Sequence, residues 1–218
     1  MDSTVNFLLS VGMRPIFELS FMPEWLANGT DTVCHYQGHV DPPYDYDEWG
    51  SIIGSLGQHL VDRFGEQTAS EFYFEVWNEP NDHFWRGDMD DYFHLYREAA
   101  LALKNASAKL RVGGPATCCA DCWMNEFVSF CSNTSTPFDF ISTHAYSSGT
   151  MSGLGSAVKV VDDIRKARQE LEAARAAASG LTPAEKAAPW LITEFGDSCA
   201  QVRTWCVCVC VCVCVCVI

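Results

Sequence analysis

Five short runs of aromatic and β-branched residues alternate along this chain with segments whose apolar residues follow helical spacing. The runs cover residues 14–21, 71–78, 110–113, 138–146 and 190–195, and the helical segments cover 49–64, 92–103, 123–130 and 156–179. Because each helical segment connects two of the runs, the pattern predicts an α/β fold with a parallel sheet and right-handed crossovers. Rossmann-type and barrel arrangements both remain open on this evidence.

Two smaller signals refine the element boundaries. The spacing of Val5, Leu8 and Leu9 predicts the last turns of a helix at the start of the chain. Near the other end, Thr182 and Glu185 enclose Pro183 in the pattern of a capping box, which predicts the start of a further helix. With 218 residues, one domain is the natural expectation.

The run FYFEVWNEP, residues 72–80, places a carboxylate where a buried strand ends. Pro80 cannot donate a hydrogen bond to a sheet, so we expect strand pairing to end at Glu79. The carboxyl ends of parallel strands are where ligands bind in α/β folds. The alternative is that Asn78-Glu79-Pro80 is only a turn, since Asn and Pro are common turn residues.

A second carboxylate, Glu194, also lies at the end of a β-rich run, WLITEFG. Only a fold that gathers its strand ends brings Glu79 and Glu194 together, and a parallel barrel does so. Retaining glycoside hydrolases need two carboxyl groups about 5–5.5 Å apart, one as acid and one as nucleophile.

Other function classes lack their usual signals. Neither G-x-G-x-x-G after the first strand nor G-x-x-x-x-G-K-[ST] occurs, which argues against nucleotide binding. The formal net charge of −14 makes nucleic acid and anionic membranes poor partners. Glycosylation triplets at Asn28, Asn105 and Asn133 favour a secretory, extracellular or lysosomal location.

The 12 cysteines are unevenly placed, and six of them alternate with valine from Cys206 to Cys216. Cys119 and Cys122 have the spacing of half a zinc site, but a suitable second half is missing, so we predict no metal site. A disulfide among Cys118, Cys119, Cys122 and Cys131 is the favoured alternative in an oxidising compartment.

The Cys-Val tail has no polar face as a strand and no polar stripe as a helix. A translated TGTGTG repeat has this sequence, so we interpret residues 205–218 as a non-native or artefactual tail. The rival interpretation, a metal-binding thiol arm, lacks the polar residues that keep such arms soluble.

Five strings along the chain resemble a known family. GMRPIFELSFMP, YFEVWNEPN, LRVGGPAT, FDFISTHAY and LITEFG resemble, in this order, the catalytic (β/α)₈ TIM-type barrel of glycoside hydrolase family 39, a family of retaining glycosidases. The resemblance covers residues 11–196. By the family's strand order, residues 14–21 form the third strand, so the prediction is an incomplete barrel of about strands 3 to 7 within residues 1–204.

The resemblance also implies residue roles. It makes Glu79 the acid/base and Glu194 the nucleophile, and it places Asn78 against the sugar 2-hydroxyl. His144 and Tyr146 fall on one face of the sixth strand, beside the nucleophile. It implies a glycoside or oligosaccharide as substrate and no cofactor.

Three further residues near Glu79 in the sequence have candidate roles. Trp85 either stacks on a sugar or packs its loop. Arg86 is the nearest candidate to bind the carboxylate of a uronic acid. Glu75 lies four residues before Glu79, so alternation along the strand would point it to the same side, into the barrel. There it would need a partner such as Arg14, and the pair would have a structural role.

The favoured function is therefore a retaining, β-xylosidase-like hydrolase. The alternatives are an α-L-iduronidase-like enzyme and an inactive remnant, because an incomplete barrel leaves unpaired strand edges.

Overall fold

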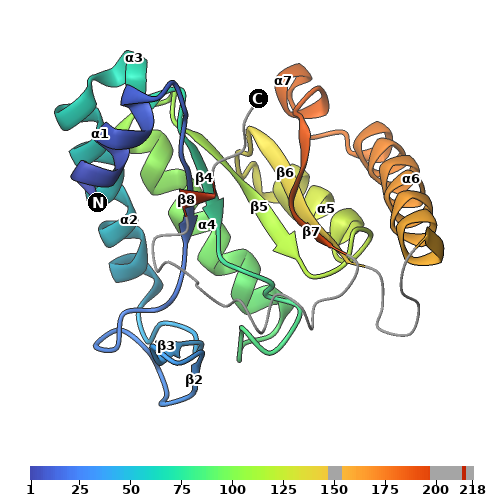
Figure 1. Ribbon diagram of the computed structural model, residues 1–218, viewed down its shortest axis with the longest axis horizontal. Helices are drawn as coiled ribbons and strands as arrows, with labels where there is room; N and C mark the ends of the chain where they lie inside the picture. The colour runs from blue at the N-terminus through green and yellow to red at the C-terminus, as the bar shows by residue number, and fades with distance from the viewer. Residues whose placement is uncertain (147–153, 197–212, 215–218) are drawn as a thin grey trace.

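The computed structural model describes residues 1–146, 154–196 and 213–214 (Figure 1). Its main sheet has the strand order β7-β6-β5-β4-β1-β8. The first five of these are parallel neighbours: β1 (Ile16–Leu19), β4 (Tyr73–Val76), β5 (Arg111–Thr117), β6 (Phe140–Tyr146) and β7 (Trp190–Gly196). The short strand β8 (Val213–Cys214) pairs antiparallel with β1. The predicted parallel sheet is confirmed.

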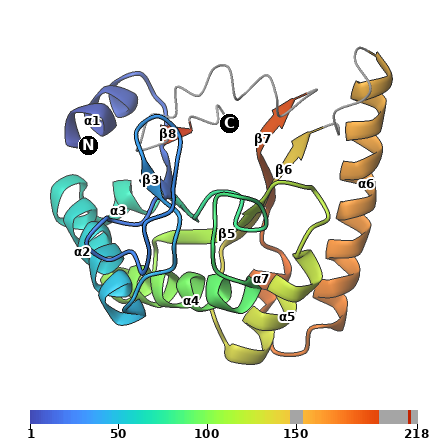
Figure 2. The ribbon, with the colours of Figure 1, turned by 90° about the horizontal axis from the view of Figure 1, so that it is seen from below.

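Helices follow the strands in an arc along the outer side of the sheet, as Figure 2 shows. They are α1 (Asp2–Ser10), α2 (Tyr46–Phe64), α3 (Glu66–Ala69), α4 (Met89–Ala106), α5 (Met124–Thr134), α6 (Leu154–Ala177) and α7 (Pro183–Lys186). A doubly wound fold reverses its strand order and covers both faces with helices. Here successive parallel strands are neighbours and the helices lie on one side, so the arrangement is that of a barrel.

Side-chain caps define where several helices begin. Asp45 accepts hydrogen bonds from the backbone N–H groups of Asp47 and Glu48 at the start of α2. Asp88 and Asp91 form a capping box on α4, and Thr182 and Glu185 form the predicted capping box on α7. Such caps satisfy N–H groups that have no partner inside the helix.

Helix α2 packs closely against α4 because glycines line the contact. A Cβ atom on Gly57 would lie 3.1 Å from Leu103 and 3.2 Å from Ala106 and Leu110. The hydrogen atom of glycine therefore lets the two helices approach at this point. Trp49 of α2 also donates to the carbonyl of Leu95, at 3.2 Å.

The core lies between the sheet and the helices and is rich in aromatic rings. Tyr92 of α4 is fully buried and donates to the carbonyl of Val76, at 3.0 Å, which anchors the helix at the end of β4. The largest fully buried side chains are Trp77, Tyr92, Tyr96, Phe72, Phe74, Phe127, Phe140, Leu26, Leu60, Leu95, Leu103 and Leu110.

Several boundaries differ from those predicted. The expectation that pairing ends at Glu79 is wrong, because β4 ends at Val76 and the next residue, Trp77, has φ +71°. A left-handed residue cannot continue an extended strand. The hairpin of β2 (Thr32–Val33) and β3 (Gly38–His39) was not predicted, since two-residue strands carry too few residues for a periodic pattern.

Within the described part of the chain, no helix has the length and apolar character needed to cross a membrane. Most of the Cys-Val tail lies outside the described residues, so the interpretation of residues 205–218 stays a prediction.

Candidate active site

Glu79 is held in a tight loop just beyond the end of β4. Its backbone N–H donates to the carbonyl of Ala116 on β5, at 2.9 Å, and its φ is +44°. Non-glycine residues seldom adopt a left-handed backbone, and such conformations are found preferentially at functional sites. The side chain is only 11% exposed.

Glu194 approaches the same point from β7. Its partner in the parallel register of β6 and β7 is His144, so both side chains leave the sheet at one level. The hydroxyl of Tyr146, two residues further along β6, donates to Glu194 Oε2 at 2.6 Å. This hydrogen bond orients the carboxylate and stabilises its negative charge.

His144 lies between the two carboxylates. Its Nδ1 is 2.8 Å from Glu79 Oε1 and 3.6 Å from Glu194 Oε2, and its side chain is 1% exposed. Burial alone would lower the pKa of His144, but the hydrogen bond to Glu79 and the charges of Glu194, Glu75 and Glu79 outweigh it and raise the pKa to about 9. The imidazole therefore carries a proton near neutrality.

The separation of the carboxylates fits one class of reaction. One oxygen of Glu79, one of Glu194 and a ring nitrogen of His144 all lie within 4.8 Å of one another. Retaining glycosidases place their carboxyl groups about 5–5.5 Å apart, whereas inverting enzymes need about 6.5–9.5 Å to admit a water molecule. The same three groups could also hold a divalent cation, since carboxylate and imidazole are common metal ligands.

Two buried polar atoms near this pair lack a hydrogen-bond partner among the described residues. They are Oδ1 of Asn78 and Nε2 of His144. A buried polar atom without a partner costs about 1–3 kcal/mol. Hydroxyl groups of a polar ligand are suitable partners for both atoms.

Glu75 lies in the strand itself and is 2% exposed. It accepts a hydrogen bond from Thr193 Oγ1 at 2.8 Å, and burial raises its pKa. The expectation that Arg14 partners Glu75 is wrong, since Arg14 pairs instead with Glu71, before the start of β4. In the register of β1 and β4, Glu18 lies opposite Glu75, and Arg14 is four residues before Glu18. Four residues of a strand span about 13 Å, so Arg14 lies level with Glu71 instead.

Trp85 and Arg86 follow the loop that carries Glu79, and both have partners within the protein. Trp85 is 4% exposed, and its ring centroid lies 5.0 Å from that of Trp77. Its Nε1 donates to the carbonyl of Asp88. This environment matches loop packing, the second of its two interpretations. Arg86 forms an ion pair with Asp31 at 2.7 Å and is half-exposed.

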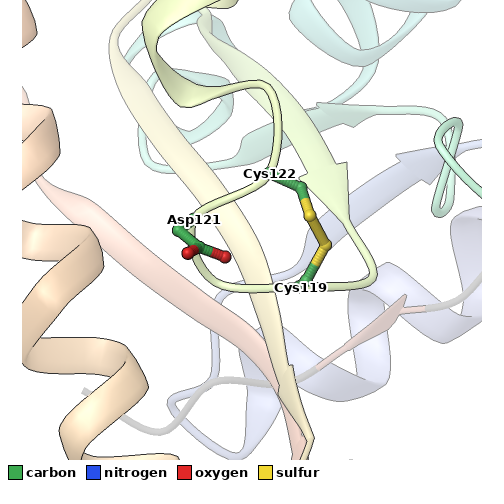
Figure 3. Close-up of side chains that lie close together, drawn as sticks. All are labelled: Cys119, Asp121 and Cys122. Atoms are coloured by element: carbon green, nitrogen blue, oxygen red, sulfur yellow. A yellow bond between two sulfur atoms is a disulfide. The ribbon is translucent and has the colours of Figure 1, made fainter.

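Cys119 and Cys122 form a disulfide in the loop after β5, with Asp121 between them (Figure 3). The pair is among the four cysteines for which a disulfide was expected. The three side chains are near enough to hold a metal ion if the sulfurs are reduced. Asp121, however, already pairs with Lys166 of α6 at 2.8 Å.

Sequence reasoning missed two residues that contact this region. Thr193 directly precedes Glu194 and donates to Glu75. It lies where the register of β6 and β7 shifts, so simple alternation along the strand does not predict this contact. Asn81 contacts Cys118 and Cys119, and no local pattern could have revealed this contact.

Comparison with known proteins gives consistent matches. The sequence model of Glycosyl hydrolases family 39 matches residues 1–217. A β-xylosidase from Caldicellulosiruptor saccharolyticus is 53% identical over 148 residues, which are 67% of this chain and 30% of that protein. Human α-L-iduronidase is 34% identical over 71 residues, or 31% of this chain and 11% of that protein.

A solved structure extends the match to the fold. The GH39 β-xylosidase from Caulobacter crescentus has 35% sequence identity and a TM-score of 0.76, over 90% of this chain and 40% of that one. The prediction of an incomplete (β/α) barrel is thereby confirmed. The chain spans about 30% of the length of the Caldicellulosiruptor relative.

Proposed function

Because the chain belongs to glycosyl hydrolase family 39, we propose that it carries the catalytic pair of a retaining, β-xylosidase-like hydrolase. Glu79 acts as the acid/base and Glu194 as the nucleophile. The observation that carries this proposal is the approach of the two carboxylates, with His144 between them and Tyr146 bound to Glu194.

The reaction takes two steps. Glu194 attacks the anomeric carbon while Glu79 gives a proton to the leaving oxygen, and a covalent glycosyl-enzyme forms. The proton comes from the Glu79–His144 pair, in which His144 passes it to Glu79 across their 2.8 Å contact. Glu79 then removes a proton from water, which attacks the same carbon and releases Glu194. Asn78, whose buried amide oxygen has no partner among the described residues, is placed to bind a sugar hydroxyl.

Two observations favour a neutral pentoside over a uronic acid. The relative with the higher identity, over the longer stretch, is a β-xylosidase rather than an α-L-iduronidase. Arg86, the cation nearest the catalytic loop in sequence, is already paired with Asp31. The ion pair with Asp31 makes the guanidinium of Arg86 less available to bind the carboxylate of a substrate.

Covalent trapping tests the proposal directly. An activated 2-deoxy-2-fluoroxyloside forms a glycosyl-enzyme that breaks down slowly, and peptide mass spectrometry of the full chain should locate the sugar on Glu194. Glu194→Gln should form no adduct. Glu79→Gln should still form it from a dinitrophenyl glycoside, because a good leaving group needs no proton.

Glu71→Gln is the matched control, since this half-buried glutamate lies before β4 and pairs with Arg14. It should label like the parent chain. A label on another carboxylate would overturn the assignment of Glu194. Absence of any label, under conditions that label the Caulobacter relative, would favour the inactive remnant. Labelling that stops with EDTA would favour the cation-binding role of Glu79, His144 and Glu194.

We also propose passage through a secretory route. Asn28, Asn105 and Asn133 are all exposed, as N-glycosylation requires. Expression in a eukaryotic secretory host should give a protein whose mass falls on treatment with peptide N-glycosidase. An unchanged mass would count against this location.

A further inference from the structure

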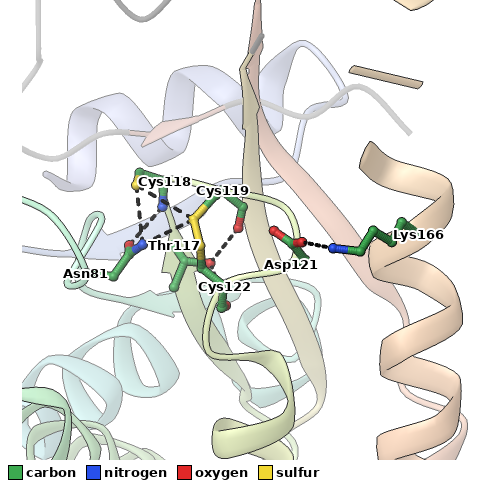
Figure 4. Close-up of a disulfide and its surroundings, with 7 residues drawn as sticks. All are labelled: Asn81, Thr117, Cys118, Cys119, Asp121, Cys122 and Lys166. Carbon is green, nitrogen blue, oxygen red and sulfur yellow. Dashed lines mark hydrogen bonds and ion pairs between the residues drawn. A yellow bond between two sulfur atoms is a disulfide. The ribbon is translucent and has the colours of Figure 1, made fainter. Parts of the chain in front are cut away.

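The loop after β5 is tied to the loop that carries Glu79. Asn81 lies two residues after Glu79, and its side chain reaches across to the cysteines of the neighbouring loop (Figure 4). Its Oδ1 accepts the backbone N–H of Cys118 at 2.9 Å. Its Nδ2 donates to the sulfurs of Cys118 and Cys119, at 3.3 and 3.4 Å.

A second tie lies next to the first. The N–H of Glu79 donates to the carbonyl of Ala116, two residues before Cys118. Glu79 and Asn81 are thus both fastened to the backbone that follows β5. The position of the Glu79 loop therefore depends on the conformation of residues 116–119.

The Cys119–Cys122 disulfide holds that conformation. Thr117 Oγ1 lies 3.1 Å from the carbonyl oxygen of Cys119 and 3.2 Å from that of Cys122. The Thr117 hydroxyl is therefore within hydrogen-bonding distance of the carbonyl groups of both cysteines in the bridge. The backbone N–H of Cys122 also donates to the carbonyl of Cys119. The Sγ of Cys119 accepts a hydrogen bond from the Asn81 side-chain amide. When the disulfide opens, this sulfur is free to rotate away from Asn81.

The disulfide is reachable from solvent. Cys118, Cys119 and Cys122 are all partly exposed, unlike Cys131, which is 1% exposed. Because both cysteines of the bridge are partly exposed, a small dithiol can reach one of their sulfurs, as thiol–disulfide exchange requires. The Sγ of Cys118 lies 4.0 Å from that of Cys119.

We propose that Cys119–Cys122 is a thiol–disulfide exchange site, and that Asn81 is a positioning residue which transmits the state of this site to Glu79. A dithiol reductant attacks one sulfur of the bridge, and the mixed disulfide is then resolved by the second thiol of the reductant. Two protein thiols and one cyclic disulfide result, so two electrons and two protons pass to the protein. The link to catalysis rests on the proposed function, but the exchange site and its coupling do not.

Hydrogen exchange of the full chain tests the coupling without requiring turnover. Differential alkylation should first show Cys119 and Cys122 protected in the oxidised chain and both labelled after dithiothreitol. Reduction should then speed exchange of the Glu79 and Cys118 amides at least tenfold. Amides of α2 and α4 should not change.

Variants distinguish coupling through Asn81 from a general loosening of the loop after β5. Asn81→Ala should exchange quickly at Glu79 in the oxidised chain, and reduction should add little more. Asn81→Asp keeps the acceptor for the Cys118 N–H but loses the donor to sulfur, so Cys118 should stay protected. Cys34→Ser, at a partly exposed cysteine in the hairpin of β2 and β3, is the control and should behave like the parent chain.

Two results would overturn the proposal. The first is alkylation of Cys119 and Cys122 without reductant. The second is faster exchange on reduction that is confined to residues 118–122 and leaves Glu79 unaffected. If fluoroxyloside labelling fails while the exchange results hold, only the proposed function is lost. If labelling succeeds, its rate should fall on reduction in the parent chain and not in Asn81→Ala.

Discussion

His144 Nδ1 lies 2.8 Å from Glu79 Oε1, although 65 residues separate the two along the chain. The same nitrogen lies 3.6 Å from Glu194, so one buried imidazole contacts both carboxylates of the proposed catalytic pair. Its proton partly offsets the repulsion between two carboxylates that are close together. This arrangement lets the two acidic groups remain near each other although the side chain of Glu79 is only 11% exposed.

The pH dependence of stability should report the proton on His144. Its pKa is raised from 6.5 to about 9 in the folded chain, so the stabilisation is complete below pH 6.5 and is lost as the pH rises through 9. The difference in free energy of unfolding between the parent chain and His144→Gln should therefore shrink by up to about 3 kcal/mol between pH 6 and pH 10. Urea unfolding at several pH values measures it.

His59→Gln controls for the loss of an imidazole, because His59 is 46% exposed and pairs with Asp2 at the surface. A difference for His144→Gln that stays constant with pH, or that changes no more than the difference for His59→Gln, would contradict the raised pKa of His144.

Tyr146→Phe should slow turnover by removing the hydroxyl that donates to Glu194 Oε2. A hydrogen bond to a charged group contributes about 1.5–3 kcal/mol, so kcat/KM for an aryl β-xyloside should fall about 10- to 150-fold. Tyr73→Phe makes the same change at the opposite end of the sheet, where the hydroxyl accepts from Arg111. It should leave kcat/KM unchanged, and equal losses in both variants would contradict a specific role for Tyr146.

Glu75→Gln should become more stabilising as the pH rises. Burial raises the pKa of Glu75 above 4.5, so its contribution to stability is present below pH 4.5 and is lost as the pH rises through the folded pKa. Glutamine stays neutral and still accepts the hydrogen bond from Thr193. The melting temperature of Glu75→Gln, relative to the parent, should thus be higher at pH 7 than at pH 4.

Thr193→Val tests the other half of this contact. It leaves Glu75 without its hydroxyl donor and should destabilise the chain by about 1–3 kcal/mol. A gain in stability from Thr193→Val, or a relative melting temperature of Glu75→Gln that falls with pH, would show that Glu75 is bound differently.

Two glycines of α2 should respond oppositely to alanine. Gly57→Ala places a Cβ 3.1 Å from Leu103, so crowding should outweigh the gain in helix propensity and destabilise the chain by about 1 kcal/mol. A Cβ on Gly54 lies 3.4 Å from Ala102, an ordinary contact, so Gly54→Ala should stabilise it by up to about 1 kcal/mol. Urea unfolding distinguishes them, and the same sign for both would contradict the close approach of α2 to α4.

The sequence by itself determined the elements and the chemistry of their ends. Alternating strand and helix patterns predicted the five parallel strands, and the capping box at Thr182 predicted the start of α7. Glu79 and Glu194 could be identified because each follows or ends a β-rich run. These are local properties, since periodicity, capping and strand termination depend on residues a few positions apart.

Only the tertiary structure decided which of these ends meet. Strand order and the one-sided layer of helices distinguished the barrel from a doubly wound sheet, and both depend on pairing between segments far apart in the chain. The contact of His144 with Glu79, the tie of Asn81 to Cys118 and the burial of Trp85 arise from the same packing. A local sequence pattern cannot predict these contacts, because each joins segments that are far apart in the chain and that only the packed core brings together.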